Sequence, residues 1–125
     1  MLLVKTYLGK SKIHGLGLFA GEFIPKGKAI WKLVPGFDAI LTKKDFNKLP
    51  KVAKDFVLHY GYYNENEGGW IICGDNSRFL NHSENANMID GDNKPGIAKR
   101  DIKKDEELTC NYFEFDDEAG FKLKE

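Results

Sequence analysis

The chain has 125 residues, 42% of them hydrophobic, and its 19 basic residues are balanced by 19 acidic ones. A chain of this size forms one domain that buries roughly two thirds of its unfolded surface in a single core. The zero formal net charge excludes a chain-wide basic footprint for nucleic acid or a strong field for a charged membrane.

Short apolar runs bounded by Gly, Pro, Asn or Asp predict β-strands along most of the chain. The candidate strands, in chain order, are residues 2–7, 15–20, 29–34, 70–73, 87–90, 96–100 and 107–110. Most are too short for a long sheet, so we expect a mainly β protein built from small strand pairs.

The middle of the chain has a different pattern, which predicts a helical insert over about residues 42–63. Thr42 is a candidate N-cap for the segment TKKDFNKL, and Pro50 suits the start of a second helix. Apolar side chains then recur near helical spacing, at Val52, Phe56, Tyr60 and Tyr63.

Two segments resemble each other, FIPKGKAI (23–30) and DIKKDEEL (101–108). Each has an Ile, a turn containing lysine, and a return to an apolar strand. We predict a hairpin in each, with Gly27 supplying a positive φ in the first turn and Asp105 in the second.

Cysteines and histidines do not show the spacing of a metal site. Cys73 and Cys110 form no CxxC pair, and His14, His59 and His82 have no HxxxH-type spacing. No apolar run approaches the length of a membrane span and no secretory signal opens the chain, so we expect a soluble intracellular protein with no bound metal.

Three motifs occur in order along the chain: GLGLFA (15–20), RFLNHSENAN (78–87) and EELTCNY (106–112). Asn-His-Ser alone would suggest only a polar turn. The ordered set resembles the SET domain of protein lysine methyltransferases, whose motifs run GxG, RFxNHSxxPN and ELTxxY, and the resemblance covers about residues 5–115. It implies a mainly β SET-domain β-clip fold, with a small helical insert and a C-terminal pseudoknot, as a single domain over residues 1–125.

The resemblance implies the cofactor S-adenosylmethionine, which becomes S-adenosylhomocysteine. Glycines let backbone groups approach a ligand closely, because no Cβ intervenes. The residues expected to bind the cofactor are Gly15, Leu16, Gly17, Arg78, Asn81, His82 and Phe113. For Arg78, a structural bond to a carboxylate is the stronger alternative, and the glycines alone would also suit a hairpin turn. Asn87 is expected to fix its loop by hydrogen bonds.

The resemblance makes Tyr112 the catalytic residue, with a hydroxyl that orients the reacting groups and does not act as a base. The expected substrate channel is lined by Tyr60, Tyr62, Cys110 and Phe115, although core packing is the alternative for each. A small Cys110 beside the amine would permit several rounds of methyl transfer. Residues 113–125 would cover the channel, with Glu114, Asp116, Asp117 and Glu118 attracting a basic peptide or forming a solvated tail.

One departure from the motif concerns zinc. Many relatives have a cysteine after Asn-His-Ser and more cysteines near the C-terminus, whereas this chain has Glu84 and no cysteine after Tyr112. It therefore looks like a short, zinc-free SET protein, in which Phe113, Phe115 and Phe121 replace the metal by packing.

The resemblance predicts a protein-lysine N-methyltransferase. Its partner would be a lysine-bearing protein or peptide, with histones and other basic proteins as candidates, and not nucleic acid or a membrane; a homodimer is left open. Two alternatives remain: an inactive SET-fold module that binds a peptide or the cofactor, and a small β-rich structural or carbohydrate-binding domain.

Overall fold

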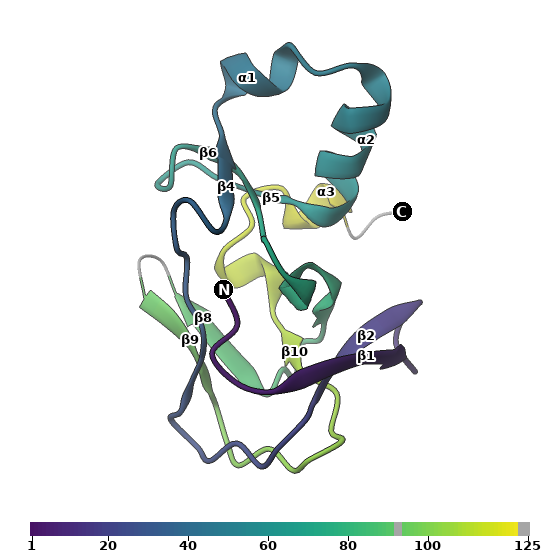
Figure 1. Ribbon diagram of the computed structural model, residues 1–125, viewed down its shortest axis with the longest axis vertical. Coiled ribbons are helices and arrows are strands. Elements are labelled where there is room, and N and C mark those ends of the chain that lie inside the picture. The colour runs from purple at the N-terminus through teal and green to yellow at the C-terminus, as the bar shows by residue number, and fades with distance from the viewer. Residues whose placement is uncertain (92–93, 123–125) are drawn as a thin grey trace.

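The computed structural model describes residues 1–91 and 94–122 (Figure 1). Helices are few and short: α1 (Lys43–Asn47), α2 (Lys51–Tyr60), α3 (Ala119–Lys122) and the 3-10 turns Asn76–Phe79 and Tyr112–Glu114. The strands are β1 (Thr6–Lys10), β2 (Leu16–Ala20), β3 (Ala29–Trp31), β4 (Ala39–Leu41), β5 (Tyr62–Asn64), β6 (Gly69–Ile72), β7 (Asn81–His82), β8 (Met88–Gly91), β9 (Lys94–Ala98) and β10 (Thr109–Cys110). The predicted mainly β class is confirmed.

In these ranges the strands form four small sheets instead of one large sheet. β1 pairs with β2, β9 lies between β3 and β8, and β6 lies between β4 and β5, all antiparallel. β7 and β10 form a parallel pair. In Figure 1 the helical insert lies at the top of the view, and β10 and the β1–β2 ribbon both lie in the lower half.

The main core lies where β2, β3, β8 and β9 meet the loops around residues 24 and 102. Alternation along β2 puts Leu18 and Ala20 on the same buried face, as the period of two in a strand requires. Among the described residues the buried cluster consists of Leu18, Ala20, Ile24, Ile30, Met88, Ala98, Ile102 and Leu108.

Several strand boundaries differ from the prediction. The first strand begins at Thr6, and Leu2 makes only an isolated bridge to Trp31. β4, β5 and β7 were not predicted, because each has two or three residues, too few for an alternation to be detected. β3 and β10 are equally short and were predicted only as parts of longer runs.

The helical insert ends earlier than predicted. Thr42 caps α1 as expected, since its Oγ1 accepts a hydrogen bond from Asp45 N at 3.1 Å. α2 ends at Tyr60, and Tyr62 and Tyr63 belong to β5. The expected apolar stripe is also wrong, because Val52 is 77% exposed and Val57 is the buried residue of α2.

The two similar segments pair with each other instead of each forming its own hairpin. Ile24 N donates to Ile102 O at 2.9 Å, and Ile102 N donates to Ile24 O at 2.8 Å. Both side chains are fully buried. The predicted positive φ values are present at Gly27 (85°) and Asp105 (73°). The prediction of the two turns is therefore confirmed, whereas the predicted pairing of strands within each segment is wrong.

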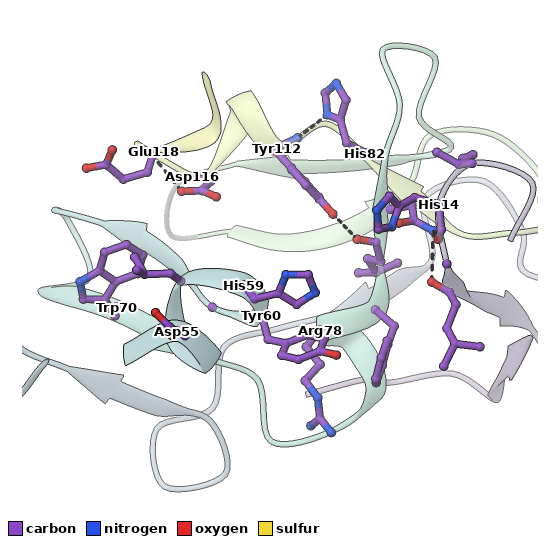
Figure 2. A pocket seen from close by; sticks show the side chains of 18 residues that line it. His14, Asp55, His59, Tyr60, Trp70, Arg78, His82, Tyr112, Asp116 and Glu118 are labelled. Atoms are coloured by element: carbon purple, nitrogen blue, oxygen red, sulfur yellow. Dashed lines mark hydrogen bonds between the residues drawn. The ribbon is translucent and has the colours of Figure 1, made fainter. Parts of the chain in front are cut away.

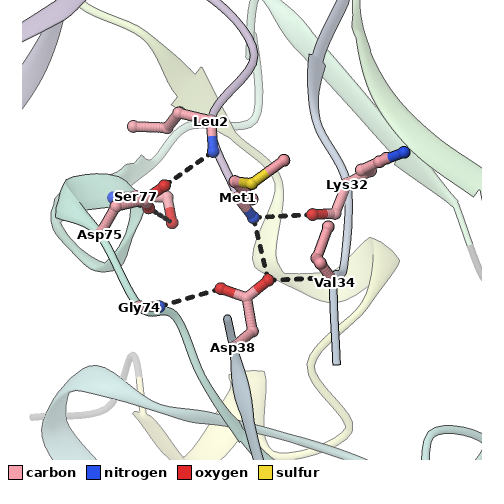
Figure 3. Close-up of polar contacts among 8 residues, drawn as sticks. All are labelled: Met1, Leu2, Lys32, Val34, Asp38, Gly74, Asp75 and Ser77. Atoms are coloured by element: carbon pink, nitrogen blue, oxygen red, sulfur yellow. Dashed lines mark hydrogen bonds and ion pairs between the residues drawn. The ribbon is translucent and has the colours of Figure 1, made fainter. Parts of the chain in front are cut away.

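Asp38 is a buried carboxylate that joins three separate segments (Figure 3). Its Oδ2 accepts from Val34 N at 2.9 Å and from the α-amino group of Met1 at 3.0 Å. Its Oδ1 accepts from Gly74 N at 2.9 Å. Asp38 therefore connects the loop before β4 to the segment that follows β6.

No helix in the described ranges is long and apolar enough to cross a membrane.

Asp38→Ala should lower the free energy of unfolding by about 2–4 kcal/mol, because the Val34 and Gly74 amides lose a buried acceptor. Denaturant titration measures this change. The control is Asp55→Ala, which removes an exposed ion pair with Lys51 and should cost less than about 0.5 kcal/mol. Equal losses in the two variants would contradict the role given to Asp38.

Candidate active site

The parallel pairing of β7 with β10 brings the second and third motifs together. Asn81 lies opposite Thr109, and His82 lies opposite Cys110. Ser83 N also donates to Cys110 O at 3.0 Å. This contact between distant segments is the pairing expected of the pseudoknot.

Asn87 holds the same two segments together a few residues further along. Its Nδ2 donates to Glu107 O at 2.8 Å, and its Oδ1 accepts from Thr109 N at 2.9 Å. The side chain is buried, so these bonds are shielded from water. The loop after Asn-His-Ser is thus fixed to β10 as the sequence led us to expect.

A cavity of about 1070 Å³ lies beside this crossing (Figure 2). Its walls come from the loop before β2, from α2, from the turn at Asn76–Phe79, and from β7 and the segment after β10. Seven of the predicted site residues line it: Gly15, Leu16, Tyr60, Arg78, Asn81, His82 and Tyr112. All three histidines of the chain also lie on its wall.

Five predicted site residues are not part of the cavity lining: Gly17, Tyr62, Cys110, Phe113 and Phe115. Tyr62 packs against Phe115, with ring centroids 4.9 Å apart. Phe113 is 63% exposed, with its ring 5.8 Å from that of His82. The side chain of Phe121 lies outside the described residues.

Cys110 lies in the core and does not face the cavity. Its side chain is 1% exposed, and Sγ is 4.0 Å from Asn81 O. This placement fits the core-packing alternative for Cys110, and its influence on the number of methyl groups transferred stays a prediction. Both residues of β10 are buried, because this strand lies inside the crossing with β7.

Tyr112 is held by two hydrogen bonds to the Asn-His segment (Figure 2). Its hydroxyl donates to Leu80 O at 2.6 Å, and its backbone N donates to His82 Nδ1 at 3.1 Å. Burial, with smaller contributions from Cys110 and Asp116, raises the pKa of the Tyr112 phenol well above its ordinary value of 10.0. The hydroxyl is therefore a neutral donor with a fixed direction.

Asn81 faces an unusual number of acceptors. Its Nδ2 lies 3.0 Å from Glu107 Oε2, 3.1 Å from His14 O, 3.3 Å from Leu16 O and 3.1 Å from Ser11 Oγ. Two of these acceptors, Glu107 and Ser11, were not among the predicted site residues. Glu107 belongs to the motif EELTCNY, but no local pattern could have revealed its contact with Ser11, because the two residues are 96 positions apart in sequence.

Arg78 does not make the carboxylate bond suggested by its alternative interpretation. Within the described residues, its buried Nε has no hydrogen-bond partner. Its guanidinium lies 5.8 Å from the ring centroid of Tyr60 and 5.2 Å from that of Phe79. Arg78 thus contributes a cationic, aromatic-packed section of the cavity wall.

The acidic segment after Tyr112 is not a solvated tail. Asp116 is buried and accepts from Tyr63 N at 3.3 Å, and Asp117 accepts from Glu65 N at 2.9 Å. These two residues attach the segment to β5 and the turn after it. Asp117 and Glu118 are both exposed, and Glu118 lies on the cavity wall.

Within residues 1–91 and 94–122, no group of three or more His, Cys, Asp or Glu side chains is placed to hold a metal ion.

Comparison with known proteins gives a consistent result. A family model described as the SET domain matches residues 15–113. The chain is 28% identical over 124 residues to "Histone-lysine N-methyltransferase 2D" of Homo sapiens, covering 90% of this chain but 2% of that protein. The chain thus spans a very small part of the curated relative.

Solved structures share the fold. One is the Polycomb Repressive Complex 2 of Chaetomium thermophilum bound to S-adenosylmethionine, with TM-score 0.64, 27% identity and coverage of 97% of this chain and 16% of that chain. A Plasmodium falciparum chain at 24% identity has TM-score 0.60, and the match covers 89% of this chain and 95% of the other. The predicted SET fold is confirmed.

At pH 10.0, the ordinary pKa of tyrosine, Tyr112 should be much less than half ionised, because its pKa is raised. The measurement is the phenolate absorbance of wild type minus that of Tyr112→Phe. For the same reason, folding stability contributed by the neutral phenol is fully present below pH 10.0 and is lost as the pH rises further. A difference spectrum equal to half a tyrosine at pH 10.0 would contradict the burial argument.

Proposed function

The chain belongs to the SET-domain family, and from this premise we propose that it is an S-adenosylmethionine-dependent protein-lysine N-methyltransferase. One observation carries the proposal: the β7–β10 pairing puts Asn81, His82 and Tyr112 on the wall of the same cavity. A SET fold without that convergence would suit a binding module equally well.

The residues present fit S-adenosylmethionine. The cofactor has an ammonium group, and the Asn81 environment has more acceptors than the two hydrogens of its amide can satisfy. The loop at Gly15 and Leu16 and the segment at Asn81 and His82 would hold the cofactor. When bound, the cofactor supplies an electrophilic methyl group on a sulfonium.

Catalysis by this chain would depend mainly on positioning the amine and the methyl group, because methyl transfer needs little general acid or base catalysis. Holding an amine in line with a methyl group is worth several powers of ten in rate. Tyr112 suits this task, since its hydroxyl direction is fixed by Leu80 O and its phenol stays neutral.

The substrate amine must lose its proton before it can react. Relative to a free lysine, this costs roughly 4–5 kcal/mol near pH 7. The rings of Tyr60, Phe79 and Tyr112 and the cation of Arg78 give the cavity wall a partly apolar, positively charged section. Such surroundings disfavour a second cation and so lower the pKa of an entering amine.

For the substrate, we propose a lysine-bearing protein. The human relative is named as a histone-lysine methyltransferase. Acidic side chains on the cavity wall, Asp55 and Glu118, are consistent with a basic peptide.

Two measurements test the proposal. Calorimetric titration with S-adenosylhomocysteine measures whether the cofactor binds. Incubation with labelled S-adenosylmethionine and a lysine-rich protein mixture measures whether label is transferred to lysine side chains. Binding without transfer to any protein would favour the inactive binding module. Absence of binding would refute the cofactor assignment.

Tyr112→Phe should reduce kcat by about tenfold to a hundredfold while the affinity for S-adenosylhomocysteine changes less than about twofold. The ring still packs against His82, but the hydroxyl that fixes its direction is lost. Single-turnover kinetics and calorimetry measure the two quantities. Wild-type turnover in this variant would remove the Tyr112 hydroxyl from the mechanism.

Replacing Asp55 by Asn and Glu118 by Gln together should raise KM for a lysine-rich peptide and flatten its dependence on salt, because both carboxylates lie exposed on the cavity wall. The matched control is Glu114→Gln, which removes an exposed acidic charge outside the cavity lining. An unchanged salt profile in the double variant would show that these carboxylates do not attract the substrate.

A further inference from the structure

The orientation of the Asn81 side-chain amide is determined by its surroundings. An amide can present either its NH₂ donor or its oxygen acceptor to a given side. Two of the atoms near Nδ2 are the backbone carbonyl oxygens of His14 and Leu16, and a third belongs to the Glu107 side chain. Carbonyl and carboxylate oxygens only accept, so the nitrogen must face this side.

The amide oxygen is therefore left for another partner. No described residue donates a hydrogen bond to Asn81 Oδ1, although the side chain is only 9% exposed. Among described residues the fully buried side-chain atoms without a partner are Trp31 Nε1 and Arg78 Nε, so Oδ1 keeps some accessible surface. Because Asn81 lines the cavity, Oδ1 is an acceptor available to a ligand there.

Glu107 is itself held in place on two sides. Ser11 Oγ lies 2.8 Å and 2.9 Å from the two carboxylate oxygens, and its single hydrogen is donated to this carboxylate. Ser11 Oγ in turn accepts from Ile13 N at 2.9 Å, which ties the carboxylate to the loop before β2. The Glu107 carboxylate therefore has little freedom to turn away from Asn81.

Gly17 makes room for this carboxylate. A Cβ at position 17 would lie 2.5 Å from Glu107 Oε2 and 2.9 Å from Glu107 Cδ, closer than real contacts allow. Gly17 itself is buried and is not part of the cavity lining. The second glycine of the motif thus serves the approach of Glu107 and not a direct approach to ligand.

We propose that Glu107 is a positioning residue for the cofactor's ammonium group: by accepting from Asn81 Nδ2 it keeps Oδ1 turned outward as the acceptor for that ammonium. The inference rests on the proposed function, since it assumes that S-adenosylmethionine binds in this cavity. The Glu107 charge also adds a favourable electrostatic term for a cation held on Asn81.

Glu107→Gln tests the proposal, because it removes the carboxylate charge behind Asn81 and replaces a group that only accepts by an amide that can also donate, which weakens the preference for one orientation of the Asn81 amide. Calorimetry would compare S-adenosylhomocysteine with its deaminated analogue, in which hydrogen replaces the α-amino group. We expect the variant to bind S-adenosylhomocysteine about tenfold more weakly and the analogue within about twofold of wild type. A structural role alone would weaken both ligands equally.

Two further variants keep the test informative if Glu107→Gln is unstable. Gly17→Ala should push the same carboxylate aside, and Ser11→Ala should release it, so both should lose affinity selectively for the ligand that carries the ammonium. Glu84→Gln is the matched control, because Glu84 is an exposed carboxylate in the loop after Asn81. Thermal melting verifies that each variant is folded.

The outcomes separate this inference from the proposed function. If wild type binds S-adenosylhomocysteine and Glu107→Gln binds it unchanged, or loses both ligands equally, the positioning role is refuted and the methyltransferase proposal stands. If wild type binds neither ligand, the cofactor assignment fails and the inference fails with it.

Discussion

The parallel contact between β7 and β10 is the constraint on which the site depends. It joins Asn81 and His82 to Thr109 and Cys110, and the turn after β10 then carries Tyr112 back to Leu80. A two-residue strand pair is weak by itself. It persists because Asn87, buried beside it, satisfies backbone groups of Glu107 and Thr109 that would otherwise lack partners in a dry environment.

The same contact links the site to the core. Leu108 is fully buried in the main cluster, so the strand that carries Glu107 and Thr109 cannot shift without disturbing that packing. The Ile24–Ile102 bridge fixes the chain that leads into this strand. Site geometry here follows from core packing, which explains how a chain of 125 residues can position groups from its beginning, middle and end around one cavity.

What could be predicted from the sequence was local or carried by the ordered motifs. Thr42 as an N-cap, positive φ at Gly27 and Asp105, and the SET fold all followed from short patterns. Partners could not be predicted: the two similar segments bond to each other, and Cys110 is buried where β10 pairs with β7. Ser11 and Glu107 meet only through the fold: Glu107 belongs to the motif EELTCNY, but nothing in that motif indicates its contact with Ser11 and Asn81.

The two glycines of the first motif answer different physical needs. Gly15 has φ of 48° with nothing within 4 Å of where a Cβ would lie, so its requirement is backbone conformation in an open loop. Gly17 has an ordinary conformation, and its requirement is space for the Glu107 carboxylate. Gly15 shapes the loop that lines the cavity, and Gly17 lets the Glu107 carboxylate reach the Nδ2 atom of Asn81. A GxG pattern read only as ligand contact therefore misses half of its function in this chain, because one of its glycines acts through an asparagine that follows it by more than sixty residues.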